Sequence, residues 1–487
     1  MSTRRIDILI AAGFAVLLLA NIAHHEMWRD ETLAWMIVRT AHSPAGLFAA
    51  LHYDGHPGLW HLLLWPATWV TTDPVAIKVV HAPIGLAIIG LVALASPFSR
   101  LERVLILGGY YLGFEYLVIS RNYAIGILLA LLHAQARVRA PDKVLLNSAL
   151  LALMANTNVY AAIFSGVLAL DYARERVVAG MALRRIIPGG ALYVAGLLIA
   201  LATVWPAADM SREITNPLAQ AYNFSLFVYS FIYFAATGLV SVIWPPNDII
   251  GDAAVLPYVV VAVALTVTVV QVFRPRPWLA AVFLTTLAAT TLFGHLVYTA
   301  SYRHFGITTI AFLTCLWIAR GQGAAPSRIG QVLLALGFLG GAPAVITHWQ
   351  EPFSMGGATA RWIAASEYAA RPLFGWPDAH TATVAAFLDR DIAMPQCGCV
   401  GPRAVFDRAR DGFRREDLPV AVNRMMTAPS LLLMVADLSP EEITAFAGQG
   451  ILVRLVQSQI AAWSDESYRI YTLDRVMPPA TSTPSRS

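Results

Sequence analysis

Residues 24–35 read HHEMWRDETLAW, and they follow directly on an apolar run at 6–23. The segment that they open closes with HYDGHP at 52–57. Asp30 and Glu31 therefore lie just after a hydrophobic stretch. Ionisable side chains are costly beside hydrocarbon, and those found there are often functional. This placement indicates a membrane protein whose first loop carries a functional site.

The composition supports a membrane-spanning architecture. Of the 487 residues, 57% are hydrophobic and 13% are charged, whereas a soluble domain carries about 25% charged residues. This excludes a soluble enzyme and a disordered chain. The net charge of +4 comes almost entirely from Arg residues that punctuate the apolar runs. That pattern is typical of cytoplasmic loop anchors, so we expect no nucleic-acid partner.

The uneven distribution of charge predicts two domains and a tail. Residues 351–487 hold 28 charged residues in 137 positions, while the first 350 positions hold the other 36. We expect a membrane domain at 1–347, a soluble α/β domain at 348–477 and a disordered tail at 478–487.

Apolar runs of spanning length predict about eleven membrane spans. They lie near residues 6–23, 75–95, 103–119, 121–136, 144–157, 158–172, 187–205, 253–273, 278–297, 304–320 and 329–347. Two further apolar stretches, at 58–72 and 224–244, are interpreted as helices at the outer interface. A crossing by either one alone would place later Arg clusters on the wrong side of the membrane.

The orientation follows from the positive charges. With the N-terminus inside, the inner loops hold fifteen Lys and Arg residues, and the outer segments before residue 348 hold six. The positive-inside rule favours this orientation. The fold class is therefore an α-helical polytopic protein of the inner (plasma) membrane with an extracytoplasmic C-terminal α/β domain.

The C-terminal domain shows the alternation of strands and helices expected of a small covered sheet. A helix is predicted at 358–370, and Ser439 with Glu442 forms a capping box that opens another helix. Strands are predicted at 430–435, 451–456 and 468–473.

Three polar clusters fall on the outer side. They comprise Asp30 and Glu31 with His56 in the first loop, then Glu115, Arg121 and Tyr123 in FEYLVISRNY (114–123), then Arg303 and His304 in SYRHFG (301–306). Each cluster also has a purely structural interpretation. The acids of the first loop could be solvated on an interfacial helix, and Glu115 could form an ion pair with Arg121. Arg303 could anchor its span at the membrane interface. Taken together, the clusters indicate a site for an anionic substrate with a lipid body, because Arg offers a planar fork of donors to phosphate.

The cysteines do not define a metal site. Cys315 lies in an apolar run, and Cys397 and Cys399 have the spacing of either a strained bridge or two free thiols. A zinc site is only weakly signalled, and use of a divalent metal ion stays open.

These motifs resemble the GT-C superfamily of membrane glycosyltransferases, in the branch of protein O-mannosyltransferases, lipid A aminoarabinose transferases and bacterial dolichyl-phosphate-mannose-type transferases. The resemblance rests on Asp30-Glu31, on Gly55-His56-Pro57, on Glu115 with Arg121, and on Arg303 before a late span. It covers the layout of residues 1–347.

The resemblance implies inverting transfer of a sugar from a polyprenyl-phosphate donor to a lipid, glycan or protein hydroxyl. Asp30 corresponds to the general base, and Glu31 to its neighbour in the acceptor pocket. Glu115 corresponds to a residue that positions a metal or the acceptor. The implied substrate contacts are His56, Arg121, Tyr123, Arg303 and His304, of which His56 and the two arginines contact phosphate.

Two other classes of function remain open at this stage. A lipid or solute transporter would line a pathway with the same charges. Against it, the spans show no matching halves, and the charges gather at one membrane face. A receptor or assembly protein would use the C-terminal domain for binding.

The orientation yields a direct prediction. Reporters fused after residues 101 and 140 should be cytoplasmic, and reporters at residues 50, 210 and 400 should be extracytoplasmic, because of the asymmetry of Arg and Lys. Alkaline phosphatase and fluorescent-protein fusions measure this. A cytoplasmic signal at residue 400 would contradict both the odd number of spans and the interfacial interpretation of 224–244.

Overall fold

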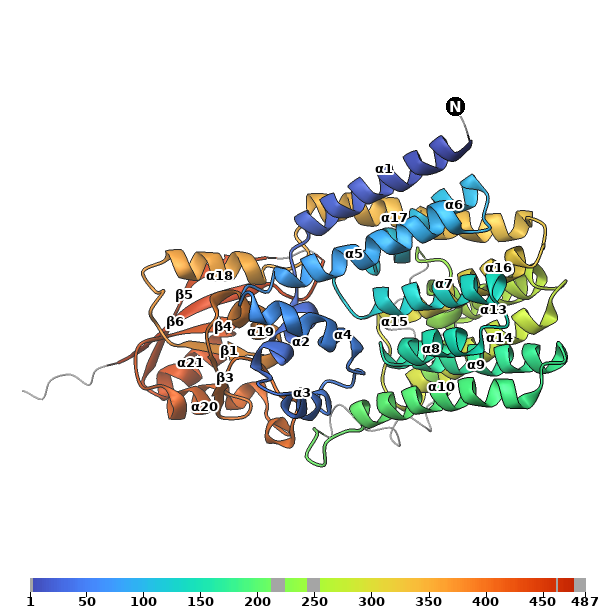
Figure 1. Cartoon of the computed structure of the whole chain (residues 1–487). Coiled ribbons are helices and arrows are strands. Elements are labelled where there is room, and N and C mark those ends of the chain that lie inside the picture. The colour runs from blue at the N-terminus through green and yellow to red at the C-terminus, as the bar shows by residue number, and fades with distance from the viewer. Residues whose placement is uncertain (1–2, 212–223, 243–254, 461–462, 477–487) are drawn as a thin grey trace, which may run out of the picture.

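The computed structural model describes residues 3–211, 224–242, 255–460 and 463–476. A helical bundle carries a sheet domain at one end (Figure 1). Helix α1 (Thr3–His24) begins at the end of the bundle away from the sheet domain and ends beside it. The predicted tail at 478–487 lies outside the described residues.

Each of the eleven predicted apolar runs contains a helix. After α1 these are α5 (Ala76–Gly90) continued by the π-helical turn η2 (Leu91–Ala95), α6 (Arg100–Leu107) followed by η3 (Tyr111–Glu115), α7 (Tyr123–Arg139), α8 (Val144–Ala155), α9 (Val159–Val178), α10 (Leu183–Val204), α13 (Val255–Val272), α14 (Pro277–Leu296), α16 (Ile307–Gly321) and α17 (Arg328–Gln350).

Six of these helices in the described ranges are long and apolar enough to cross a membrane: α1, α5 with η2, α10, α13, α14 and α17. The expected count of about eleven is therefore not confirmed. Helix α8 has 12 residues, which at about 1.5 Å per residue do not cover a hydrocarbon core of about 30 Å. Helix α9 carries charges at one end, and its Asp171 pairs with Arg137 of α7 at 2.7 Å.

The two stretches assigned to the interface differ in burial. The first forms α4 (Leu59–Leu64) and the 3₁₀ turn η1 (Trp65–Trp69), and Trp69 is 75% exposed. The second forms α12 (Phe224–Ile232) and η4 (Tyr233–Thr237), and η4 is buried within the bundle. Small residues allow this close packing, since Gly238 lies against the Phe305 carbonyl. Residues 243 and 244 lie outside the described residues.

The C-terminal domain is a six-stranded mixed sheet with the order β3-β2-β1-β4-β6-β5. Strand β1 runs parallel to β2 and β4, and the other pairs are antiparallel. The three predicted strands are confirmed as β4, β5 and β6. The sequence prediction missed β1 to β3, which have three or four residues each. The strands are β1 (Leu373–Trp376), β2 (Ile392–Met394), β3 (Cys399–Gly401), β4 (Ser430–Met434), β5 (Ile451–Gln459) and β6 (Tyr468–Arg475).

Helices cover both faces of this sheet. Helices α18 (Gly356–Ala365) and α19 (Asp378–Leu388) cover one face, and α20 (Leu418–Met425) and α21 (Pro440–Gly448) cover the other. Strand β4 is buried along its whole length, as a continuous apolar run between two helical layers should be. The capping box opens α21 as predicted. Cys397 and Cys399 form a disulfide, which decides the alternative left open by the sequence.

Candidate active site

The first loop folds into α2 (Arg29–Thr40), α3 (Pro44–Leu51) and α4, which lie between the bundle and the sheet domain (Figure 1). Asp30 and Glu31 occupy the first turn of α2, where acidic side chains interact favourably with the helix dipole. Glu31 is 0% exposed. The alternative of an interfacial helix with solvated acids is therefore wrong.

Asp30 is held between two arginines from distant parts of the chain. Its Oδ2 lies 2.5 Å from Nη1 of Arg121 and 2.7 Å from Nη2 of Arg303. Arg303 belongs to α15 (Tyr302–Phe305). Burial alone would raise the pKa of Asp30, but the charges of Arg303 and Arg121 outweigh it and hold the pKa well below its usual value. Asp30 is therefore ionised throughout the physiological range.

Further contacts position the two guanidinium groups. Nη2 of Arg121 lies 3.4 Å from Nε2 of His56. Burial lowers the pKa of His56 to about 4, so its imidazole is neutral at pH 7. Arg121 also lies over the Tyr123 ring at 5.4 Å, and Arg303 lies over the Trp28 ring at 5.3 Å. His56, Tyr123 and both arginines thus converge around Asp30.

Glu31 points away from this group. Its carboxylate accepts hydrogen bonds from His25 Nε2 at 2.9 Å, from the Ser120 backbone N–H at 2.7 Å and from the Trp28 N–H at 3.2 Å. The bond to Ser120 fixes the turn that carries Arg121. Glu31 does not line the cavity beside Asp30, and its hydrogen bonds lie instead with His25, Trp28 and the turn before Arg121.

Glu115 and His304 are also set apart from Asp30. Glu115 accepts a hydrogen bond from the Tyr110 hydroxyl at 2.7 Å, and Arg121 pairs with Asp30 instead. The alternative of a Glu115–Arg121 pair is therefore wrong. His304 Nδ1 accepts the Ser301 N–H at 2.7 Å, and its ring stacks on Tyr160. This His closes the first turn of α15, next to Arg303.

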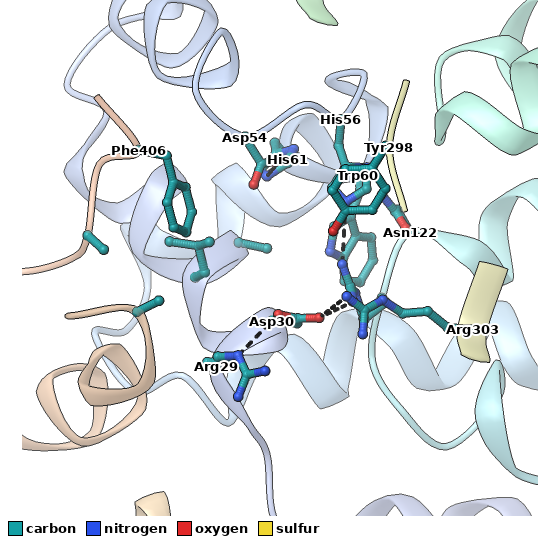
Figure 2. A pocket seen from close by; sticks show the side chains of 15 residues that line it. Arg29, Asp30, Asp54, His56, Trp60, His61, Asn122, Tyr298, Arg303 and Phe406 are labelled. Atoms are coloured by element: carbon teal, nitrogen blue, oxygen red, sulfur yellow. Dashed lines mark hydrogen bonds and ion pairs between the residues drawn. The ribbon is translucent and has the colours of Figure 1, made fainter. Parts of the chain in front are cut away.

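A cavity of about 150 Å³ opens beside Asp30 (Figure 2). The bundle, the first loop and Ala379, Ala404 and Phe406 of the C-terminal domain all contribute to its walls. The sequence analysis did not assign seven polar or aromatic residues of this lining to the site. Asp54 was recognisable, because it stands in the HYDGHP motif with His56. The seven are Arg29, Asp54, Trp60, His61, Asn122, Tyr298 and Phe406.

Arg303 also lines a second cavity of about 590 Å³. Glu115 lines it together with aromatic side chains such as Tyr110, Tyr302 and Trp463. Tyr110 and Ser241 are shared with an apolar cleft between α6, η3, α16 and α17. No Asp, Glu, Lys or Arg lines that cleft in the described chain. Arg303 thus lines both cavities.

The C-terminal domain is fixed directly to the start of α2. The guanidinium of Arg29 pairs with both carboxylate oxygens of Asp465, and its backbone N–H donates to Glu466 at 2.7 Å. The buried Glu466 carboxylate also accepts from Ser354 Oγ at 2.6 Å. These contacts hold the residue that immediately precedes Asp30.

No group of three or more His, Cys, Asp or Glu side chains within the described ranges is arranged to hold a metal ion. We therefore assign no metal ligands.

No model of a known protein family matches the sequence, and no curated protein is similar to it. Solved structures do match. The structure of ArnT from Cupriavidus metallidurans in the apo state superposes with a TM-score of 0.55 and 11% identity, over 96% of this chain and 97% of that one. ArnT bound to undecaprenyl phosphate matches with a TM-score of 0.51 and 12% identity, over 97% and 98%.

This chain has the fold of ArnT. The match runs through both the helical bundle and the sheet domain, since it covers nearly the whole of each chain. The expected layout of a helical domain followed by an α/β domain is therefore confirmed at the level of the fold, and six helices of the described ranges are long and apolar enough to cross a membrane. At 11–12% identity the likeness does not transfer a substrate.

The docking of the C-terminal domain should depend on pH through Glu466. Burial raises the pKa of Glu466 to about 7, above the ordinary value of 4.5. Between these values the folded state binds more protons than the unfolded state, so stability should fall as pH rises from about 4.5 to 7. Thermal unfolding of the purified protein at pH 5 and pH 8 measures this.

The variant Glu466→Gln should show a smaller difference between the two pH values. Glu367→Gln, which changes an exposed carboxylate of the same domain, serves as the matched control and should behave as wild type. An unchanged pH dependence in Glu466→Gln would show that Glu466 does not titrate in this range.

Proposed function

We propose that this protein is a membrane glycosyltransferase that moves a sugar from a polyprenyl-phosphate donor to an acceptor hydroxyl, with inversion. The reaction takes place on the extracytoplasmic side of the inner (plasma) membrane, as the fifteen inner and six outer positive charges favour. The observation that carries the proposal is the placement of Asp30 between Arg121 and Arg303. A single site thereby offers a carboxylate base and two cations for a phosphate.

The two arginines bind the phosphate that leaves with the lipid. A guanidinium offers planar, paired donors to phosphate oxygens. Arg303 has spare donor capacity, because its Nε is buried without a hydrogen-bond partner among the described residues. In a partly dry site, positive charge aimed at a developing phosphate anion lowers the barrier to departure of the leaving group.

The lipid chain of the donor begins in the second cavity, which Arg303 lines. Tyr110 and Ser241 of that cavity also line the apolar cleft. A phosphate on Arg303 therefore places the start of its chain near α6, α16 and α17. The solved complex of ArnT with undecaprenyl phosphate supports a donor of this class.

Asp30 accepts the proton of the acceptor hydroxyl. Before the donor binds, both arginines depress the basicity of Asp30. A bound phosphate competes for the same guanidinium groups, so the donor itself restores the basicity of the carboxylate. The acceptor oxygen then forms its bond to the anomeric carbon, the bond from that carbon to the phosphate oxygen breaks, and the electron pair leaves with the phosphate.

Replacing the base tests the mechanism. Asp30→Asn should lower the rate of sugar transfer by about 10²–10⁴-fold. Donor binding should be retained or tightened, because both arginines lose a competing anion. The assay follows transfer from radiolabelled polyprenyl-phosphate sugar, and donor affinity is measured on the same protein. Asp73→Asn, an exposed carboxylate of the outer loops, is the control.

Transfer at the wild-type rate by Asp30→Asn would remove Asp30 from the mechanism. Glu31→Gln should give a smaller defect, because Glu31 acts through the position of Arg121. A transporter would give a different pattern: the wild-type protein would transfer no sugar, and Asp30→Asn would alter translocation.

The geometry of the phosphate contact can be separated from its charge. Arg303→Lys keeps the charge but loses the paired donors, so it should weaken donor binding moderately, and Arg303→Ala should weaken it much more. Isothermal titration with the polyprenyl phosphate alone measures both affinities. If Arg303→Ala binds this lipid as wild type does, Arg303 serves only to anchor its helix.

A further inference from the structure

Asp54 and His61 form a second polar group in the cavity beside Asp30. Asp54 Oδ2 lies 3.6 Å from His61 Nε2, and the two side chains are 9% and 1% exposed. Figure 2 shows them side by side, across the cavity from Asp30 and Arg303. The sequence analysis did not assign either residue, and the proposed phosphate site and base do not use them.

Apart from this contact with each other, three polar atoms of the two side chains make no hydrogen bond in the part of the chain that the structure describes. Asp54 Oδ2 and both ring nitrogens of His61 are buried without a hydrogen bond, and the gap of 3.6 Å between the two residues exceeds a normal hydrogen-bond distance. Buried polar atoms in native proteins are nearly always satisfied, because leaving them unpaired is costly. Since both residues line the cavity, a ligand with hydroxyl groups can satisfy them.

The charge state of the pair fits neutral hydroxyls better than an anion. Burial lowers the pKa of His61 to about 3, so the imidazole is neutral at pH 7 and can donate or accept. Burial raises the pKa of Asp54, and in neither protonation state does this side chain supply the positive charge that a phosphate needs. A phosphate therefore belongs at the arginine side of the cavity, and a hydroxyl-bearing group belongs at Asp54 and His61.

Aromatic rings line the same cavity. Trp60 comes from the first loop next to His61, and Phe406 comes from the C-terminal domain on the side of the cavity near Asp54 (Figure 2). A sugar ring combines an apolar face, which packs on such rings, with hydroxyls on neighbouring carbons. Two unpartnered atoms 3.6 Å apart match adjacent hydroxyls, whereas a serine or threonine side chain offers a single hydroxyl.

We propose that Asp54 and His61 bind adjacent hydroxyls of a carbohydrate acceptor, with Trp60 and Phe406 against its ring. This rests on the glycosyl transfer proposed above and narrows the acceptor from a lipid, glycan or protein to a sugar. The C-terminal domain then contributes to acceptor selection through Phe406, and Asp30 faces the hydroxyl that reacts.

Binding and kinetics on the full-length protein test this. The probes are radiolabelled methyl pyranosides of glucose, galactose and mannose, with N-acetyl-threonine amide for comparison. Wild type should bind at least one glycoside more tightly than the threonine derivative. Asp54→Asn and His61→Gln should weaken that binding and raise the acceptor KM at least tenfold, while affinity for the polyprenyl-phosphate donor stays unchanged.

His42→Gln, an exposed histidine of the same outer segment, is the matched control and should bind as wild type. Unchanged donor affinity establishes that each variant is folded, and His61→Gln decides the question if Asp54→Asn does not fold. Wild-type glycoside binding by both variants, or preference for the threonine derivative, would overturn the proposal. If the donor binds and is consumed with an unchanged acceptor KM in both variants, the subsite is wrong and the transferase stands. If wild type neither binds nor consumes the donor, the proposed function itself fails.

Discussion

The ion pairs of Asp30 with Arg121 and Arg303 are the interaction on which the site depends. They join the first loop, the turn before α7 and the short helix α15, which are far apart in the sequence. A buried charge is tolerated only when it is paired, so none of the three segments can shift alone without exposing a partner. The group carries one excess positive charge, which suits it to receive an anion.

Hydrogen bonds from neighbouring polar residues hold the segments that carry Asp30, Arg121 and Arg303. Glu31 holds the Ser120 backbone and thereby the turn of Arg121, while His304 closes the turn next to Arg303. From the other side, Asp465 and Glu466 hold Arg29, the residue before Asp30. The C-terminal domain is thus part of the site, because it both fixes α2 and supplies Phe406 to the cavity wall. Because Arg29 is bonded directly to Asp30, loosening of that domain would displace the proposed base.

Long helices and strands were predicted from the sequence more reliably than short ones. Long apolar runs and the five-residue strand SLLLM were recognised, because burial on all sides leaves a continuous hydrophobic pattern. The strands β1 to β3 were missed, since three or four residues carry too little pattern. The structure does not confirm the number of spans expected from the apolar runs. Helices such as α9 place their charges against partners inside the bundle, as the Arg137–Asp171 pair does.

By itself the sequence determined a multi-pass membrane protein with a covered sheet at its C-terminus, because hydrophobicity and its period are local properties of the chain. It also predicted that the charged residues Asp30, Arg121 and Arg303 lie at the outer face of the membrane domain. Only the tertiary structure decided which residues meet. Glu31 and Glu115 look equivalent to Asp30 in sequence, yet one lies in the scaffold and the other in a separate cavity. The role proposed for Asp54 and His61 depends on buried polar atoms that make no hydrogen bond. This burial arises only when folding brings the segments of the cavity wall together.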